Sequence, residues 1–163
     1  MKNTIQYCVV GLSHKNADLA TRGNFSLDKR QTESLLAQAK VDGVEELMVI
    51  STCNRTELMG IVHDPKILID YLCSFSGGDV SLFIEKGYVL SDLEALDHVF
   101  RVGCGLESQI IGDFEIIGQL KRAFSNSKKQ QIINTHLISR NFELLTSGKE
   151  SPSKILSFWT KNH

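Results

Sequence analysis

The stretch EELMVISTCNRTELMGIV, residues 45–62, contains two short apolar runs separated by a polar segment of four residues, CNRT. Runs of this length that are rich in Val, Ile and Met are typical of buried strands. So short a separation favours two antiparallel strands, EELMVIST and ELMGIV, joined as a hairpin. The sequence therefore predicts a hairpin near the middle of the chain, with functional residues at its turn.

Strand and helix patterns alternate on both sides of this hairpin. Asp42-Gly43 closes the helix before it, and Asp64-Pro65 supplies an N-cap and a first-turn proline for the helix after it. The elements expected outside the hairpin are a strand in IQYCVVGLSH (5–14) ending at Gly11, helices in DKRQTESLLAQAK (28–40) and KILIDYLCSF (66–75), and a strand in LFIEKGYVL (82–90). The order β-α-β-β-α-β predicts an α/β (α+β) chain with a ferredoxin-like, split β-α-β antiparallel sheet and helices on one face.

From Ser91 onward the pattern is helical only. Ser91 and Glu94 have the spacing of a capping box, and an apolar stripe at helical intervals follows them. A second helix is expected to begin near Asp113, and a third to cover THLISRNFELLTS, residues 135–147. We expect these appended C-terminal helices to pack on or beside the sheet.

Length and composition fit one soluble domain. The chain has 163 residues, of which 42% are hydrophobic and 23% charged, and its formal net charge is -1. This charge gives no global basic field, so any contact with nucleic acid would be local, and no DNA partner is expected. There is neither a signal-peptide pattern nor a run of the roughly 18 apolar residues that a membrane span needs. We therefore expect a cytoplasmic protein without a membrane partner.

The four cysteines are scattered and lack the paired spacing of a metal site. Three of them, Cys8, Cys73 and Cys104, are expected to be small buried side chains. Cys53 is different because it follows a strand directly and lies in the polar turn. A neighbouring cation such as Arg55 would favour the nucleophilic thiolate there. A cysteine that occurs in a polar turn by chance is the alternative interpretation.

A second group of titratable residues lies in EALDHVFRVGCGLES, residues 94–108. Glu94 is one helical turn from His98, and Asp97 is one turn from Arg101. A carboxylate at this spacing would favour the protonated imidazole and prepare His98 as a proton donor. Two solvated ion pairs on a helix surface are the alternative.

Three separate stretches together resemble the N-terminal catalytic domain of the glutamyl-tRNA reductase family. They are GLSHKNADLATR (11–22), ISTCNRTEL (50–58) and HVFRVGCGLESQIIGDFEIIGQLKRAF (98–124). They occur in the family's order and at its approximate separations, so the resemblance covers the chain from about residue 7 to about residue 145.

The resemblance implies an activity. The cysteine that matches Cys53 attacks the ester that joins glutamate to the tRNA 3′ end and forms a thioester. NADPH then delivers hydride to give glutamate 1-semialdehyde, which starts tetrapyrrole synthesis. Glutamyl-tRNA is the implied partner, together with the downstream aminomutase, and the full-length enzyme is expected to be a homodimer.

The resemblance also implies the site residues. Thr52 and Arg55 would hold the amino and carboxylate groups of the glutamyl moiety, with Asn54 and Ser108 assisting, and His98 would lie near the nucleophile. Many relatives carry Glu-Pro-Gln where this chain has Asp-Phe-Glu, and this segment is a further expected substrate contact. Its residues are Asp113, Phe114, Glu115 and Gln119.

Residues 1–147 are therefore expected to be the catalytic domain, and 148–163 a divergent tail in place of the start of a spine helix. The NADPH-binding and dimerisation domains are expected to be absent, because no strand followed by G-x-G-x-x-G occurs in the sequence. Two other functions fit the same residues. One is a non-catalytic ferredoxin-like module that binds RNA or a regulator, and the other is a thiol hydrolase of small acyl esters.

Overall fold

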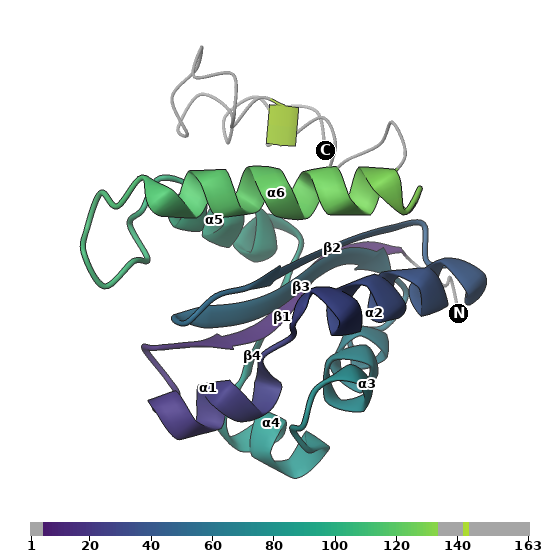
Figure 1. Cartoon of the computed structure of the whole chain (residues 1–163), viewed down its shortest axis with the longest axis horizontal. Coiled ribbons are helices and arrows are strands. Elements are labelled where there is room, and N and C mark those ends of the chain that lie inside the picture. The colour runs from purple at the N-terminus through teal and green to yellow at the C-terminus, as the bar shows by residue number, and fades with distance from the viewer. Residues whose placement is uncertain (1–4, 134–141, 144–163) are drawn as a thin grey trace.

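A four-stranded antiparallel sheet organises the fold in the computed structural model, which describes residues 5–133 and 142–143 (Figure 1). The strand order is β2-β3-β1-β4, and each neighbouring pair is antiparallel. The strands are β1 (Gln6–Ser13), β2 (Glu46–Ser51), β3 (Arg55–Val62) and β4 (Tyr88–Ser91). This order is that of two split β-α-β units, so the predicted ferredoxin-like α/β fold is confirmed.

Each β-α-β crossover contains two helices where the sequence analysis expected one. They are α1 (Leu19–Phe25) and α2 (Lys29–Val41) before the hairpin, and α3 (Lys66–Phe75) and α4 (Val80–Lys86) after it. The predicted start of the last strand, at residue 82, was therefore wrong. Asp79 accepts a hydrogen bond from the backbone of Leu82 and caps α4, which buries Phe83, and β4 begins only at Tyr88.

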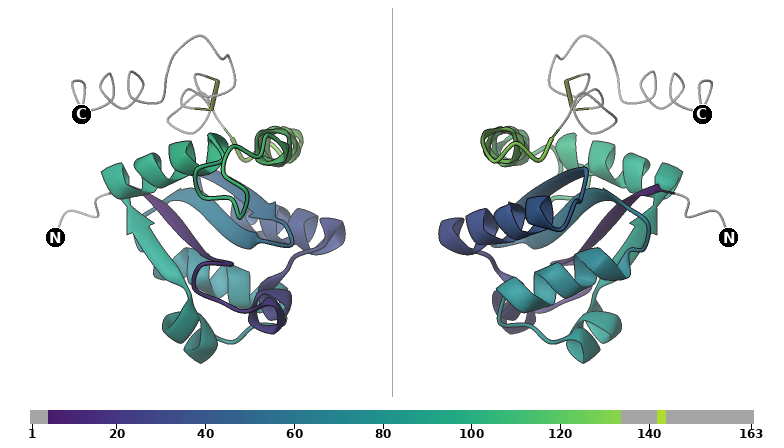
Figure 2. Two further views of the ribbon diagram at one scale, coloured as in Figure 1. Left: turned by 90° about the vertical axis from the view of Figure 1, so that its left-hand side faces the viewer. Right: turned by 90° about the vertical axis from the view of Figure 1, so that its right-hand side faces the viewer.

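Helices cover both faces of the sheet, which corrects the prediction of one covered face (Figure 2). Because strand side chains alternate, β1 buries Cys8, Val10 and Leu12 against α1 to α4. It buries Tyr7 and Val9 against α5 (Asp92–Gly103) and α6 (Glu115–Lys129). The predicted thin stripe of apolar residues on the C-terminal helices therefore forms a second core.

The starts of these two helices lie close to the predicted positions. Ser91 is the N-cap of α5, but its side chain makes no capping hydrogen bond, so the predicted capping box is absent. α6 begins at Glu115 with Phe114 as its N-cap, near the predicted start at Asp113. Of the third predicted helix, only residues 142–143 lie in the described part, where they are helical and Phe142 stacks on Phe124. The rest of that helix and the tail 148–163 lie outside the described residues.

Among the described residues, no single helix has the length and apolar character of a membrane span. Only α3 and α4 taken together reach those limits, and the chain bends by 119° between them.

Candidate active site

The turn between β2 and β3, residues 52–54, presents Cys53 to solvent and is called the Cys53 turn below. The backbone N–H of Thr52 donates to the carbonyl oxygen of Arg55 at 2.8 Å. The hydroxyl oxygen of Thr52 accepts from the backbone N–H groups of Asn54 and Arg55, both at 3.2 Å. These bonds form a side-chain-capped turn, so the thiol is carried by a fixed backbone at the end of two paired strands.

The loop after β1 borders the Cys53 turn. The backbone N–H of His14 donates to the carbonyl oxygen of Asn54 at 2.8 Å. Arg22, at the end of α1, donates from Nε to the carbonyl oxygen of Cys53 at 3.1 Å and from Nη1 to that of Ala17 at 2.7 Å. β1 itself extends to Ser13, two residues beyond the predicted end at Gly11, because Ser13 pairs with Arg55.

Arg55, the first residue of β3, has a buried side chain. Its side chain is only 3% exposed. Nη1 donates to Oε1 of Glu57 at 2.9 Å, and Nη2 donates to the backbone carbonyl of Glu107 at 2.7 Å. The guanidinium therefore joins β3 to the loop between α5 and α6.

His98 pairs with Glu57 and not with Glu94, which corrects the helical pairing considered from the sequence. Its Nε2 lies 2.7 Å from Oε1 of Glu57, whereas Glu94 is exposed in the first turn of α5. Arg101 likewise binds Glu107, at 2.8 Å from its Nε, in place of Asp97. The two helical pairs are replaced in different ways: His98 reaches Glu57 on the sheet that α5 covers, whereas the exposed Arg101 reaches Glu107 in the loop that follows α5.

Glu57 is the residue that the sequence analysis missed. Its side chain is completely buried, and Oε1 accepts from Arg55 and from the hydroxyl of Tyr88 and lies within hydrogen-bond distance of Nε2 of His98. Burial alone would raise the pKa of this carboxyl. The hydrogen bond and charge of His98, together with Arg55 and Tyr88, instead hold the pKa of Glu57 below its usual value. The signal in the sequence was a carboxylate two positions after Arg55 in a strand, and thus on the same face.

Glu107 fixes the loop between α5 and α6. Its carboxylate binds Lys15 from the loop after β1 and Arg101 from α5. Burial opposes its ionisation, but the hydrogen bonds from Lys15 and Arg101 lower the pKa of Glu107 to about 2. Ser108 is the next residue, half-buried in the same loop, and the Glu107–Arg55 contact joins this loop to the first residue of β3.

Residues 10–153 match the family model described as the N-terminal domain of glutamyl-tRNA(Glu) reductase. The chain belongs to this family. It is 50% identical over 137 residues to glutamyl-tRNA reductase 2 of Flavobacterium johnsoniae, covering 84% of this chain and 32% of that protein. It is also 32% identical over 149 residues to the glutamyl-tRNA reductase of Natranaerobius thermophilus, covering 86% and 32%. The chain thus spans about a third of the length of these relatives.

A solved structure of glutamyl-tRNA reductase from Methanopyrus kandleri has the same fold as this domain. The TM-score is 0.68 at 23% sequence identity, and the match covers 86% of this chain and 33% of that one. The resemblance predicted from the three sequence stretches is therefore confirmed, both for the family and for the fold.

The remaining predicted site residues of this glutamyl-tRNA reductase family domain lie on or before α6. Gln119 and Thr52 both line an open hollow of about 380 Å³ between α2, β2 and α6, so the structure brings these two together. Asp113 accepts a hydrogen bond from the backbone of Glu115 at 2.9 Å, and the side chain of Phe114 is 86% exposed. Within the described residues, none of these last three has a hydrogen bond to the Cys53 turn.

His14 is a further titratable residue of the domain beside the Cys53 turn. Its Nδ1 is buried and has no hydrogen-bond partner among the described residues. Burial, with the charges of Arg55 and Arg22, lowers the pKa of His14 and so favours its neutral imidazole.

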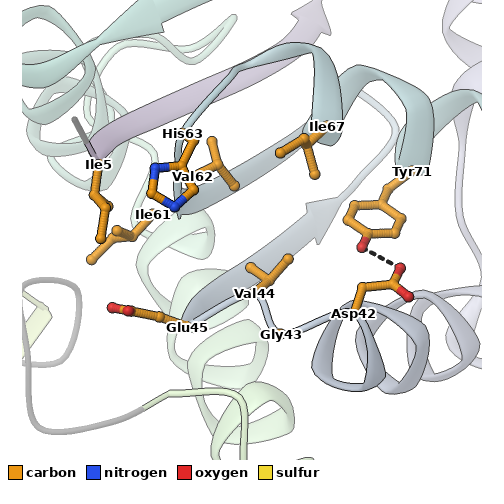
Figure 3. Close-up of a pocket in the computed structure, with 10 residues that line it drawn as sticks. All are labelled: Ile5, Asp42, Gly43, Val44, Glu45, Ile61, Val62, His63, Ile67 and Tyr71. Atoms are coloured by element: carbon orange, nitrogen blue, oxygen red, sulfur yellow. Dashed lines mark hydrogen bonds between the residues drawn. The ribbon is translucent and has the colours of Figure 1, made fainter. Parts of the chain in front are cut away.

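A second hollow, of about 340 Å³, lies at the other end of β3 in this domain (Figure 3). Its walls are mainly apolar side chains. Two of its lining residues are hydrogen-bonded to each other: the hydroxyl of Tyr71 donates to the carboxylate of Asp42 at 2.6 Å. None of the predicted site residues lines it. In the described part of the chain, no group of three or more His, Cys, Asp or Glu side chains is placed to hold a metal ion.

Proposed function

We propose that this domain carries out the acyl-transfer half of the glutamyl-tRNA reductase reaction, with Cys53 as the nucleophile. One observation carries the proposal. An exposed thiol lies on a hydrogen-bonded turn at the start of β3, the strand that carries the buried pair Arg55 and Glu57, and His98 of α5 binds that pair through Glu57. The relatives that share this domain are named glutamyl-tRNA reductases, which supplies the substrate class.

The proposed step is the displacement of an ester by a thiolate. The sulfur of Cys53 attacks the carbonyl carbon, a carbon–sulfur bond forms, and the bond to the tRNA 3′ oxygen breaks. The electron pair leaves with that oxygen, which takes a proton and becomes the free ribose hydroxyl. We assign to His98 the role of holding or supplying this proton, because Glu57 holds its Nε2 and, among the described residues, its Nδ1 has no hydrogen bond and could serve the reaction.

We assign recognition of the glutamyl group to the residues around the turn. The hydroxyl oxygen of Thr52 accepts two backbone hydrogen bonds, and its proton is donated over 3.5 Å to the carbonyl oxygen of Arg55, so this proton would turn from that long bond to the substrate. Arg55 has five N–H donors, of which two are used by Glu57 and Glu107, and the remaining donors would bind the substrate carboxylate. Asn54 and Ser108 would assist, and the further substrate contacts would be Asp113, Phe114, Glu115 and Gln119.

The reductive half of the reaction would use NADPH as the hydride donor, but these residues do not fit a dinucleotide. The described strands form an antiparallel sheet, and the sequence has no G-x-G-x-x-G after a strand. We therefore derive no NADPH step for this chain. For a reductase as long as the relatives, we propose further that the thioester is reduced to glutamate 1-semialdehyde for tetrapyrrole synthesis. Such a reductase would form a homodimer and interact with the aminomutase. Residues 1–147 would be its catalytic domain.

The test is transfer of label from glutamyl-tRNA without NADPH. The protein is mixed with glutamyl-tRNA carrying radioactive glutamate, quenched in acid and assayed for bound label, beside Cys53→Ser and the matched control Cys104→Ser. We expect hydroxylamine-labile label on the wild type and on Cys104→Ser, and none on Cys53→Ser. Binding of the tRNA without label would favour a non-catalytic RNA-binding module. Turnover of small esters without preference for glutamate would favour a thiol hydrolase.

A further inference from the structure

The open hollow between α2, β2 and α6, called the β2-edge hollow below, adjoins the Cys53 turn. Thr52 belongs both to the wall of this hollow and to the turn. The volume of about 380 Å³ lies within the range of ligand sites, which is about 300–1,000 Å³. The function proposed above uses the thiol and the groups that hold the glutamyl moiety, so it leaves most of this hollow without a role.

The floor of the hollow is the open edge of the sheet. β2 is the outermost strand, and α2 and α6 pack on opposite faces of the sheet (Figure 2). The backbone N–H of Leu47 donates to the carbonyl oxygen of Ile132, away from β3. Because backbone groups alternate in direction along an antiparallel strand, those of Val49 and Ser51 also face outward, and both residues line the hollow. In the described part of the chain these outward groups have no backbone partner, so the hollow offers free donors and acceptors.

The walls of the hollow add positive charge and neutral polar groups. Lys29 and Thr32 line it from α2. Arg122 and Asn126 line it from α6. Among the described residues, neither Lys29 nor Arg122 has an ion pair. The acidic residue of the lining, Asp28, is the N-cap of α2, where the helix dipole offsets its charge.

Two unpaired cations beside a polar strand edge fit a segment of RNA. The chain has a net charge of -1, so any attraction for RNA has to be local. Lysine and arginine bind phosphates, while amide, hydroxyl and backbone groups bind ribose hydroxyls and the edges of unpaired bases. The hollow meets the turn of the nucleophile at Thr52, which is where the 3′ end of glutamyl-tRNA would have to bring its ester.

We propose that the β2-edge hollow binds the unpaired 3′ end of glutamyl-tRNA, with Lys29 and Arg122 on its phosphates. This inference rests on the proposed function, because it places the ester of the same substrate at Cys53. The unpaired end fits better than a duplex, since the strand edge lies between two helices and only splayed nucleotides reach it. A polypeptide strand could also pair with the edge of β2, but such pairing would not need the two cations.

The first measurement is RNA binding without glutamate, and therefore without chemistry. Two uncharged hairpins with the acceptor-stem sequence of tRNA(Glu) are compared by fluorescence anisotropy, one with the unpaired 3′ end and one blunt. We expect the wild-type protein to bind the hairpin with the unpaired end about tenfold more tightly or better, because hydrogen bonds between charged groups contribute at least this factor. Equal affinity for the two hairpins would overturn the proposal.

The second measurement tests the two cations. Lys29→Gln and Arg122→Gln should each reduce the preference for the unpaired end about fivefold to tenfold, and each should lower the salt dependence of binding by about one phosphate contact. Arg30→Gln and Lys121→Gln are the matched controls. They remove the same charge from neighbouring exposed positions of α2 and α6, at two described residues that do not line the hollow. Equal losses in all four variants, or a loss in none, would overturn the proposal.

The third measurement separates binding from chemistry in the single-turnover reaction. For Lys29→Gln and Arg122→Gln, the glutamyl-tRNA concentration that gives half the maximal rate of thioester formation should rise about fivefold to tenfold. A fall in the maximal rate at an unchanged half-saturating concentration would overturn the proposal. Absence of thioester on the wild-type protein would contradict the proposed function, while the hairpin comparison, which involves no reaction, would still decide the role of the hollow.

Discussion

The two ends of β3 differ in the side chains that surround them: one end has buried charged groups, and the other has mainly apolar groups. At its start, Arg55 and Glu57 are buried and bonded to residues from β4, α5 and the loop after α5. At its other end, the hollow in Figure 3 has mainly apolar walls and a tyrosine–aspartate bond between α3 and the end of α2. β3 thus carries a buried, densely bonded pair of charges, Arg55 and Glu57, at the end that adjoins the Cys53 turn. Such concentration of buried titratable groups is typical of functional sites.

The largest expected effect on stability comes from disrupting the buried ion pair at the start of β3, which is called the charged end of β3 below. Arg55→Ala leaves the buried Glu57 without its guanidinium, and loss of one partner of a buried ion pair costs about 3–5 kcal/mol of unfolding free energy. Urea denaturation measures it. Lys66→Ala is the matched control, because Lys66 pairs with Asp70 on the surface of α3 and its loss should change the urea midpoint little. Equal effects of the two substitutions would contradict the comparison.

Filling the space at Gly11 should have the next largest effect. Gly11→Ala forces its Cβ against β3, and we expect a loss of about 2–3 kcal/mol of stability. Gly23→Ala in α1 is the control, because no atom lies within 4 Å of its added Cβ and helical alanine is favoured over glycine by up to about 1 kcal/mol. If Gly11→Ala were as stable as Gly23→Ala, the Glu57 side chain would have to be able to move away from the added methyl group without cost, which would contradict the tight fit at Gly11.

Acid should weaken the charged end through Glu107. Its pKa is about 2 in the folded protein, below the unfolded value of about 4.3, so its contribution is fully present well above pH 4.3 and is lost as pH falls towards 2. We therefore expect wild type to exceed Glu107→Gln in urea midpoint at neutral pH, and the difference to vanish near pH 2. A difference that is the same at both pH values would show that Glu107 acts by packing alone.

The smallest effect is expected at the apolar end. Tyr71→Phe removes one partly exposed hydrogen bond to Asp42, and we expect a loss of at most about 1 kcal/mol with no change in thioester formation. The same labelling assay and urea denaturation check both statements. A large fall in labelling would mean that the two ends of β3 are coupled.

The hairpin was predictable because it depends on local sequence. Two apolar runs around CNRT fix both the strands and the exposed position of Cys53, and the family resemblance followed from motifs in order. α4 was misread because LFI reads equally well as a buried strand or as the buried side of a short helix, and the Asp79 cap decides for the helix.

The partners of the site residues were not predictable in the same way. Glu94 lies one helical turn from His98, but His98 binds Glu57 instead. Glu57 is 41 residues away in sequence and comes close to His98 only when α5 packs on the sheet. Arg55 was expected at the surface of a turn, and the pairing of Ser13 with Arg55 places it at the end of a buried strand pair instead. Such contacts depend on which face of each helix or strand is covered by other elements, and this cannot be determined from a single sequence.

The most direct test of the proposal is the position of the acyl group after reaction with glutamyl-tRNA in the absence of NADPH. Peptide mass spectrometry of the acid-quenched protein locates the added glutamyl mass. We predict that it lies on Cys53, at the tip of the turn above Arg55 and Glu57. A glutamyl group on another residue, or none on a folded protein that binds the tRNA, would contradict the assignment of Cys53 as the nucleophile.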